Sequence, residues 1–238
     1  MDYQGQESWV GEKIGIVGIL IGLFILDVIV EIPLAAAGML EPSFSSQLII
    51  TGIGVIVGIS SAALCILCLK KYHWADFHPV HLFREGNTAK TVGILAAGLG
   101  MLILANTIGF LLMYLVQHDI VLRNQELLIE LMRAAPVMAA FLAIIAAPIF
   151  EEAIFRVGIF RLIKDANIAV VVSAILFGLF HVFGEALLLG FLLSLIAYAL
   201  VGFVLAKIYQ KYQSYTINVL VHVLINFVAV VEILPILG

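Results

Sequence analysis

The sequence predicts an all-α fold, a bundle of about seven helices that crosses a membrane several times. Of the 238 residues, 63% are hydrophobic and only 12% are charged, whereas soluble domains are about half apolar and about a quarter charged. The mean hydropathy is +1.18. Apolar runs of about 18 residues or more, long enough to span a bilayer as a helix, recur along the whole chain. These observations predict a multi-pass integral membrane protein, in the plasma membrane if the source is prokaryotic.

The apolar runs define the expected membrane spans. The fifth span is short, and only Gly184-Glu185 separates it from the sixth, so we expect a tight helical hairpin there. One fused helix would be far longer than the hydrocarbon thickness. The seven expected spans are residues 14–38, 47–69, 91–116, 136–161, 168–183, 186–209 and 216–237.

The basic residues of the connecting segments predict the orientation, because cytoplasmic loops carry an excess of lysine and arginine. One side of the expected bundle has only Arg123 and Arg133. The N-terminus is therefore expected in the cytoplasm and the C-terminus outside. The other side carries Lys13, Lys70, Lys71, Arg84, Lys90, Arg161, Lys164, Lys207 and Lys211.

Two connections are longer than a turn. Residues 70–90 mix charges with aromatic rings, which suits the headgroup level of a membrane. Residues 118–133 set apolar against charged side chains and predict a short interfacial amphipathic helix. No repeat or linker divides the chain, so we expect a single membrane domain. Within this domain, residues 1–135 hold the first three spans with interfacial loops, and residues 136–238 form the transmembrane core with the candidate functional residues.

Charge and cysteine content exclude several classes of protein. The formal net charge is −4 and the basic residues are scattered, which argues against nucleic acid as a partner. Two cysteines are too few for a disulfide framework. Residues 1–13 are polar and acidic, and the following apolar run is too long for a cleaved signal peptide, so we expect it to stay as the first helix. The lipid bilayer is an expected partner, and the sequence does not indicate an oligomeric state.

The fourth apolar span contains two carboxylates and a guanidinium. Ionisable groups at membrane depth cost several kcal/mol each unless they are paired or hydrated, which makes them candidates for function. Glu152 and Arg156 are four residues apart, so on a helix they share a face and can neutralise each other. Glu151 points about 100° away, and without that partner it can act as a general base if a water and a second polar group reach it. Alternatively, both glutamates only lock helix packing through an interhelical ion pair.

Two later spans add polar side chains. His181 lies four residues after Phe177, and His222 and Asn226 share one face of the last span. A single histidine in such a helix commonly just bonds to a neighbouring helix. At a rise of about 1.5 Å per residue, however, Glu151, His181 and Asn226 lie at similar depths. We therefore expect these helices to surround a water-filled pocket.

Three motifs occur intact, in order, on three apolar segments within about the last hundred residues. They resemble the CPBP family of intramembrane proteases, also called the Abi or CAAX-protease family. The resemblance implies an enzyme, an endopeptidase that cuts a peptide or protein substrate near the cytoplasmic half of the bilayer. The substrate would enter from the membrane or from the cytoplasm. The motifs are Glu151-Glu152-x-x-x-Arg156, Phe177-x-x-x-His181 and His222-x-x-x-Asn226.

The resemblance also implies a role for the matching residues. Glu151 would take a proton from a water held jointly with His181, and this water would attack the scissile carbonyl. His222 and Asn226 would donate hydrogen bonds to the oxyanion, a contribution of about 3 to 4 kcal/mol per donor in comparable hydrolases.

The other implied roles concern the charged pair and the metal. Glu152 and Arg156 would orient Glu151 or bind the substrate backbone. We expect no cofactor, although zinc is possible because two histidines and a glutamate match a catalytic zinc site. Its ligands would be Glu151, His181 and His222, but the H-E-x-x-H arrangement is absent. The residues also fit a metal-free, glutamate-activated water.

Two other classes of function stay open. In a proton- or ion-coupled transporter, Asp27 and Glu31 of the first span would join the glutamates and histidines in a relay, and inverted repeats with interrupted helices would be expected. The sequence shows neither. A non-catalytic membrane scaffold or immunity protein would use the same bundle only to bind a partner.

Two further patterns have simpler explanations. Cys65-x-x-Cys68 precedes three histidines, but we expect the cysteines to pack within the second span rather than to bind a metal. The glycines of that span, with Ser61 and Ala62, are expected to allow close helix contact, as is Gly178 in the fifth span.

Overall fold

The computed structural model describes residues 13, 15–25, 44–75, 77–83, 87–116, 122–182 and 188–237. Within these ranges every regular element is helical, which confirms the all-α prediction. An apolar helix, Gly15–Ile25, comes first. It is followed by α2 (Phe44–Lys71), α3 (Pro79–Leu82), α4 (Thr88–Val116), α5 (Arg123–Ala134), α6 (Pro136–Phe141), η1 (Leu142–Ala146), α7 (Ala147–Glu151), η2 (Glu152–Gly158), α8 (Ile159–Leu162), α9 (Ala166–His181), α10 (Leu188–Tyr212) and α11 (Tyr215–Leu237).

Five helices of the described chain are long and apolar enough to cross a membrane. Two shorter apolar helices, Gly15–Ile25 and Ala166–His181, lie at the positions of the first and fifth expected spans. The protein is therefore a multi-pass helical membrane protein, while the number of seven spans stays a prediction. The five long spans are Thr51–Lys71, Thr88–Val116, Pro136–Leu162, Leu189–Tyr212 and Tyr215–Leu237.

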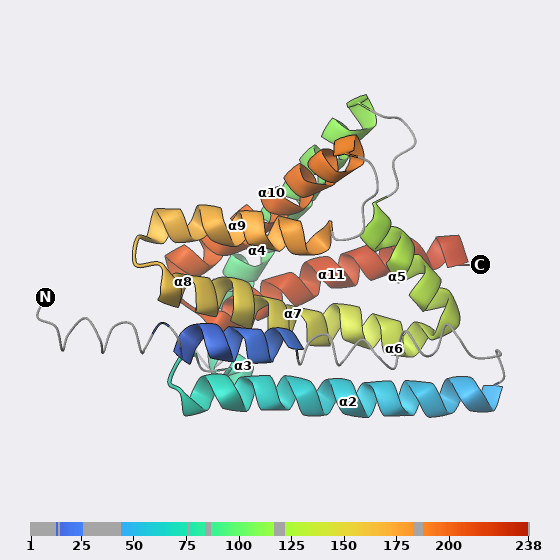
Figure 1. Cartoon of the computed structure of the whole chain (residues 1–238), viewed down its shortest axis with the longest axis horizontal. Helices are drawn as coiled ribbons and strands as arrows, with labels where there is room; N and C mark the ends of the chain where they lie inside the picture. The colour runs from blue at the N-terminus through green and yellow to red at the C-terminus, as the bar shows by residue number, and fades with distance from the viewer. Residues whose placement is uncertain are drawn as a thin grey trace, which may run out of the picture.

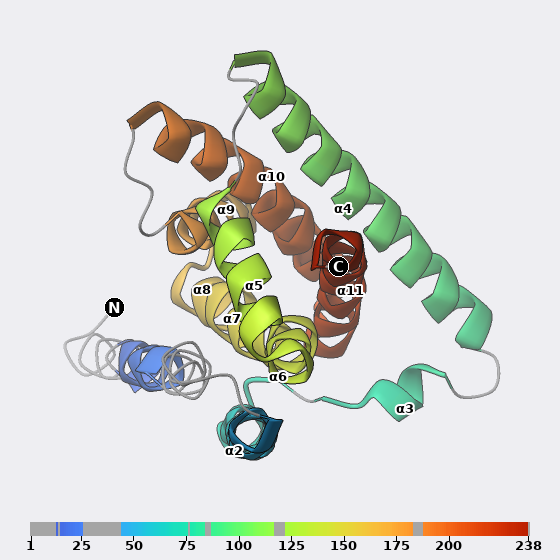
Figure 2. The same cartoon turned by 90° about the vertical axis from the view of Figure 1, so that its right-hand side faces the viewer.

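The helices form two groups that run in different directions (Figures 1 and 2). The helix Gly15–Ile25, α2, α6 to α9 and α11 follow the long axis of the molecule, whereas α4 and α10 slant away from it side by side. The slanted pair approaches closely where a Cβ atom on Gly109 would lie only 2.9 Å from the Cα atom of Ala197. The helices α4 and α10 thus pack directly against each other along this slant.

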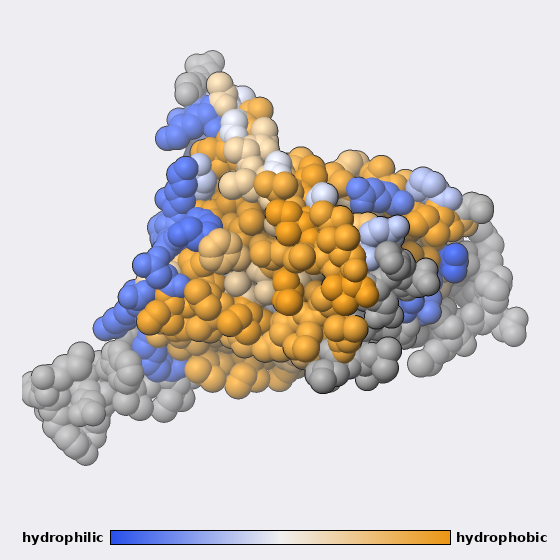
Figure 3. Space-filling model, turned by 90° about the horizontal axis from the view of Figure 1, so that it is seen from above, coloured by the Kyte–Doolittle hydropathy of each residue, from blue (hydrophilic) through white to orange (hydrophobic). Residues whose placement is uncertain are grey.

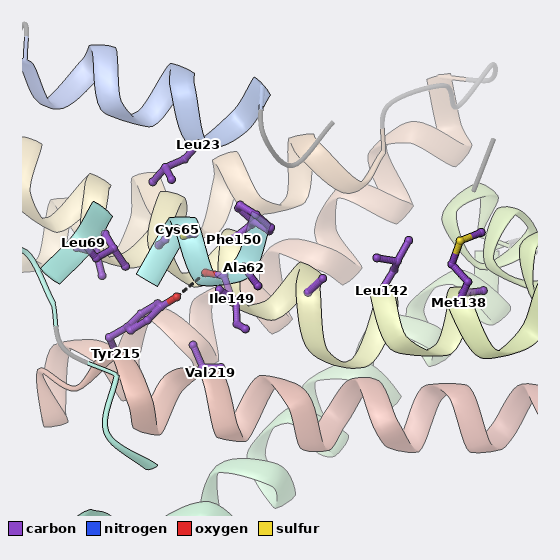
Figure 4. Packing of buried hydrophobic residues seen from close by; sticks show 14 of the residues in the cluster. Leu23, Ala62, Cys65, Leu69, Met138, Leu142, Ile149, Phe150, Tyr215 and Val219 are labelled. Carbon is purple, nitrogen blue, oxygen red and sulfur yellow. Dashed lines mark hydrogen bonds between the residues drawn. The ribbon is translucent and has the colours of Figure 1, made fainter. Parts of the chain in front are cut away.

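The largest buried apolar cluster joins residues 136–162 to α2 and α11 (Figure 4). A Cβ atom on Gly58 would lie 2.8 Å from the Phe141 ring, and one on Gly54 would overlap Met138. The expected close packing of the second span is confirmed at these two glycines. Cys65 has no exposed surface and belongs to the same cluster, as expected for a packing residue.

Hydrophilic residues gather along one edge of the molecule in the view of Figure 3, next to a broad apolar face. Lys13 donates to the carbonyls of Arg161 at 2.8 Å and Leu162 at 2.6 Å. Arg161 in turn donates to the carbonyl of His73 at 2.9 Å. Basic residues predicted to share one side of the membrane therefore meet at one end of the bundle, where they cap the last turn of α8.

The two longer connections contain helices in their described parts. The amphipathic segment forms α5, which leads at Ala135 directly into α6. The aromatic segment forms the short helix α3, held by a hydrogen bond of 2.7 Å from the Thr91 hydroxyl to the carbonyl of Leu82. Their expected location at the membrane interface stays a prediction. The Gly184-Glu185 turn lies outside the described residues.

Candidate active site

The helix that carries the two glutamates is irregular. Residues 136–162 continue as one rod, but η1 and η2 are π-helical, a feature often found at functional sites. In η1 the N–H of Ala147 donates to the carbonyl of Leu142, five residues back. Pro148 has no N–H to continue this pattern to the carbonyl of Ala143. The Asn226 amide of α11 donates to that carbonyl instead, at 2.8 Å.

Glu152 and Arg156 form a buried ion pair. Arg156 Nε lies 3.3 Å from Glu152 Oε2, and neither side chain has exposed surface. The expected pairing of these residues is therefore observed, although the segment is π-helical. Arg156 Nη2 also donates to the carbonyl of Gly202 on α10 at 3.3 Å, and its guanidinium carbon lies 4.6 Å from the centre of the Phe177 ring. These contacts offset part of the cost of burying the charge.

Both oxygens of Glu152 contact polar groups of α11. Oε1 lies 2.8 Å from His222 Nδ1, and Oε2 accepts a hydrogen bond of 2.7 Å from the Asn218 amide. A carboxylate can accept several hydrogen bonds, and charge-assisted bonds of this length are among the stronger ones. Glu152 is therefore held both by Arg156 of its own segment and by two side chains of α11.

Glu151 lies on a different side of the helix and contacts two imidazoles. Its Oε2 atom is 3.6 Å from His222 Nε2 and 3.8 Å from His181 Nε2. Both distances exceed that of a direct hydrogen bond. This buried oxygen has no hydrogen-bond partner among the described residues. The structure thus brings α7, α9 and α11 together around one carboxylate oxygen.

The opposite nitrogens of both histidine rings are occupied. His181 Nδ1 lies 2.9 Å from the carbonyl of Phe177. Because a carbonyl can only accept, His181 Nδ1 carries the hydrogen, and Nε2 of the neutral ring is an acceptor. By the same reasoning His222 Nδ1 donates to the carboxylate of Glu152. Each ring therefore turns its Nε2 atom towards Glu151.

Aromatic rings fix the position of His181. The Phe177 ring lies 4.3 Å from it between centroids, and Tyr198 of α10 stacks on it at 4.8 Å with an angle of 27° between the planes. The close approach of α9 to α10 makes this possible, because a Cβ atom on Gly178 would lie 3.0 Å from the carbonyl oxygen of Leu195. The expected close approach at Gly178 is confirmed.

Asn226 differs in part from the expectation. It lies on the same helix as His222, but its described hydrogen bond goes to the helix backbone at Ala143. This bond uses one of the two amide hydrogens and leaves the other for a ligand.

Sequence reasoning missed two residues of the site. Asn218 precedes His222 by four residues, and this helical spacing was a signal that could have found it. Tyr198 stacks on His181 from an apolar helix, and no motif pointed to it.

The sequence also left open whether the site binds a metal ion. Within the ranges that the structure describes, no group of three or more His, Cys, Asp or Glu side chains is arranged to hold a metal ion. The expected absence of a metal, and zinc at Glu151, His181 and His222 as its alternative, both stay predictions.

These features define a class, a multi-pass helical membrane protein with a buried cluster of carboxylates and imidazoles. Residues 133–228 match the family model described as "Rce1-like: Type II CAAX prenyl endopeptidase Rce1-like". All three motifs lie within this stretch. The match confirms the resemblance to the CAAX-protease family and supports a peptidase-like assignment.

Two curated proteins of Lactococcus lactis subsp. lactis (strain IL1403) are similar to the chain. "UPF0177 protein YvdC" is 28% identical over 136 residues, which cover 56% of this chain and 50% of that protein. "UPF0177 protein YaiH" is 39% identical over 82 residues, which cover 34% of this chain and 32% of that protein. The chain thus spans about half or less of the length of these relatives, whose names state no activity. No solved structure matches the chain.

Proposed function

We propose that the protein is an intramembrane endopeptidase in which a water between Glu151 and His181 hydrolyses a peptide bond. One observation carries the proposal. Glu151 Oε2 has no hydrogen-bond partner among the described residues and faces the Nε2 atoms of two imidazoles at 3.6 and 3.8 Å. Polar groups at such distances are commonly bridged by water. The family match supports the same activity.

The bridging water is suited to nucleophilic attack. It donates one hydrogen to Glu151 Oε2 and the other to His181 Nε2, because both atoms are acceptors. A lone pair of the water oxygen then points at the carbonyl carbon of the bound substrate. As the C–O bond forms, Glu151 takes the proton of the water, and it later gives this proton to the leaving nitrogen when the C–N bond breaks.

The developing oxyanion needs hydrogen-bond donors. In the resting ring the His222 hydrogen lies on Nδ1 and is bonded to Glu152, so His222 donates to the oxyanion only after its Nε2 atom has taken up a proton. Asn226 donates its second amide hydrogen while the first holds the carbonyl of Ala143. Each such donor is worth about 3 to 4 kcal/mol in comparable hydrolases.

Two other functions use the same residues differently. A transporter would require Asp27 and Glu31 in a relay, and both lie outside the described residues. A scaffold or immunity protein would need no carboxylate with a free oxygen at this position. We favour hydrolysis because the two Nε2 atoms converge on that oxygen.

The test replaces Glu151 by glutamine, which keeps the shape of the side chain and removes its ability to act as a base. Membranes of cells that produce the wild type or Glu151→Gln are compared by quantitative peptide mass spectrometry. Glu130→Gln, an equivalent change at an exposed site on α5, is the matched control. We expect a set of cleavage products that is present with the wild type and Glu130→Gln and absent with Glu151→Gln.

Two results would overturn the proposal. Identical products from wild type and Glu151→Gln, with both proteins folded and equally abundant, would indicate a scaffold. Loss of proton uptake in Glu151→Gln proteoliposomes, without any change in peptides, would indicate a transporter.

A further inference from the structure

Asn218 of α11 is fully buried and connects Glu152 of η2 to Leu205 of α10. Its Nδ2 atom donates to Glu152 Oε2 at 2.7 Å and to the carbonyl of Leu205 at 2.9 Å. An asparagine amide carries two hydrogens, so both are used. The side chain therefore cannot turn without breaking a buried hydrogen bond.

The carboxylate that Asn218 holds is the one that contacts His222. Glu152 Oε2 receives Asn218 on one side and faces Arg156 Nε at 3.3 Å on another, which leaves Oε1 for His222 Nδ1 at 2.8 Å. Rotation of the Glu152 carboxylate about its Cγ–Cδ bond would break the contacts at Oε2. These contacts therefore fix the direction of the Oε1 lone pairs. Because His222 Nδ1 donates to Oε1, they also fix the plane of the His222 ring.

We propose that Asn218 is a positioning residue: by holding Glu152 it keeps His222 in the tautomer and orientation that turn Nε2 towards Glu151. The inference rests on the proposed hydrolase for its kinetic consequence, but the orientation of His222 can be measured without any substrate. It assigns Glu152 to His222, and not to Glu151 or to the substrate backbone as the family resemblance implied.

A purely structural role is the alternative. Asn218 also ties α11 to α10 through the carbonyl of Leu205, and loss of this contact alone would lower stability without changing the ring of His222. A useful test must therefore read the state of the imidazole separately from the stability of the fold.

The experiment uses the full chain in lipid nanodiscs with ¹⁵N-labelled histidine. Ring-nitrogen spectra report which nitrogen carries the hydrogen, and His222→Gln identifies the signals of that ring. Asn218→Leu keeps the branching of the side chain and removes both donors. Asn218→Ser keeps one donor and decides the test if the leucine variant does not fold.

Thr216→Val is the matched control. Thr216 is a buried polar residue of the same helix, and its hydroxyl accepts from the backbone N–H of His78. Valine keeps its shape and removes the hydroxyl. We expect this control to lower stability while the His222 signals stay as in the wild type.

In both Asn218 variants we expect the His222 signals to shift from the single Nδ1–H form towards a mixture of the two tautomers. Unchanged His222 signals in a folded variant would overturn the proposal, whatever the activity. On a peptide cleaved by the wild type, we expect kcat to fall about 10- to 100-fold for Asn218→Leu, as misplacement of a catalytic group does, with KM little changed. Wild-type kcat in a folded Asn218→Leu would also overturn it.

The two proposals fail separately. If Glu151→Gln leaves all cleavage products unchanged but Asn218→Leu alters the His222 signals, the positioning role stands and the peptidase does not. If Glu151→Gln abolishes cleavage while the Asn218 variants keep the wild-type signals, the peptidase stands and the positioning role does not.

Discussion

Arg156 is the largest side chain without exposed surface. Its buried positive charge is compensated by only a few neighbouring groups. The guanidinium contacts Glu152, the carbonyl of Gly202 and the face of the Phe177 ring. Nη1 has no hydrogen-bond partner among the described residues. A buried pair of this kind contributes little net stability, but removal of one member leaves the other charge uncompensated.

We therefore predict that Arg156→Met destabilises the protein by about 3 to 5 kcal/mol, the usual cost of breaking a buried pair. Unfolding in mixed micelles with increasing denaturing detergent measures the loss. Arg133→Met, the same change at an exposed residue of α5, should change stability by less than about 0.5 kcal/mol. The double variant with Glu152→Gln should recover part of the loss, and equal losses in the single and double variants would contradict the ion-pair account.

At the scale of single residues, the sequence predicted what charge alone demands. The spacing of Glu152 and Arg156 allowed them to neutralise each other inside an apolar span, and they form an ion pair. Glu151 was expected near His181, and the two side chains lie 3.8 Å apart. Asn218 was missed because a neutral amide carries no such demand. Its spacing from His222 was a weak signal, and its contacts in three dimensions reveal its role.

The helices α9 and α10 approach each other closely at two glycines, Gly178 and Gly202. A Cβ atom on Gly202 would lie 3.1 Å from both the carbonyl oxygen of Ala174 and the Cβ atom of Phe177. The same stretch of α10 supplies the Gly202 carbonyl to Arg156. Close packing of these helices therefore holds the site together on the side of His181.

We predict that Gly202→Ala lowers stability by about 1 to 3 kcal/mol, because the added methyl group pushes against the α9 backbone and Phe177. Gly100→Ala is the control, since a Cβ atom at Gly100 meets nothing within 4 Å, and alanine is better than glycine in a helix by about 1 kcal/mol. Unfolding of both variants under one condition makes the comparison. Equal stability of Gly202→Ala and Gly100→Ala would contradict the close packing described here.

The type and approximate position of the helices followed from hydropathy, but their irregularities did not. Hydropathy does not distinguish α-helical from π-helical segments, so η1 and η2 could not be recognised from the hydropathy of residues 136–161. Pro148 was the one visible signal, because its missing N–H leaves a backbone carbonyl that Asn226 must satisfy. The slant of α4 and α10 depends on contacts such as Gly109 with Ala197, which no local pattern encodes.

At the scale of the whole molecule, the basic residues at one end of the bundle predict its orientation. Lys13 and Arg161 meet there, next to the last turn of α8. The positive-inside rule places this end in the cytoplasm. The connection between α10 and α11 lies close to Lys211 and should be cytoplasmic, while Leu237 should lie on the other side.

Reporter fusions test this orientation. Green fluorescent protein inserted between Gln213 and Ser214 should fluoresce, and the same reporter fused after Leu237 should stay dark, because it does not mature after export through the general secretory route. Alkaline phosphatase, which is active only outside the cytoplasm, should give the reverse pattern. The opposite result at both positions would contradict the orientation and move the expected substrate entry to the other face.

The central claim is that Glu151 activates a water for peptide hydrolysis, and single-turnover cleavage by purified protein in nanodiscs tests it most directly. The substrate is a peptide that spans the cleavage site defined by the products missing from Glu151→Gln cells, and the protein is first stripped of metal ions. We predict that the stripped wild type keeps its rate, whereas Glu151→Gln binds the peptide equally well and cleaves it about 10²- to 10⁴-fold more slowly, the usual effect of losing a general base. Equal cleavage rates for the two proteins, or a wild type that cleaves only after zinc is restored, would contradict the account.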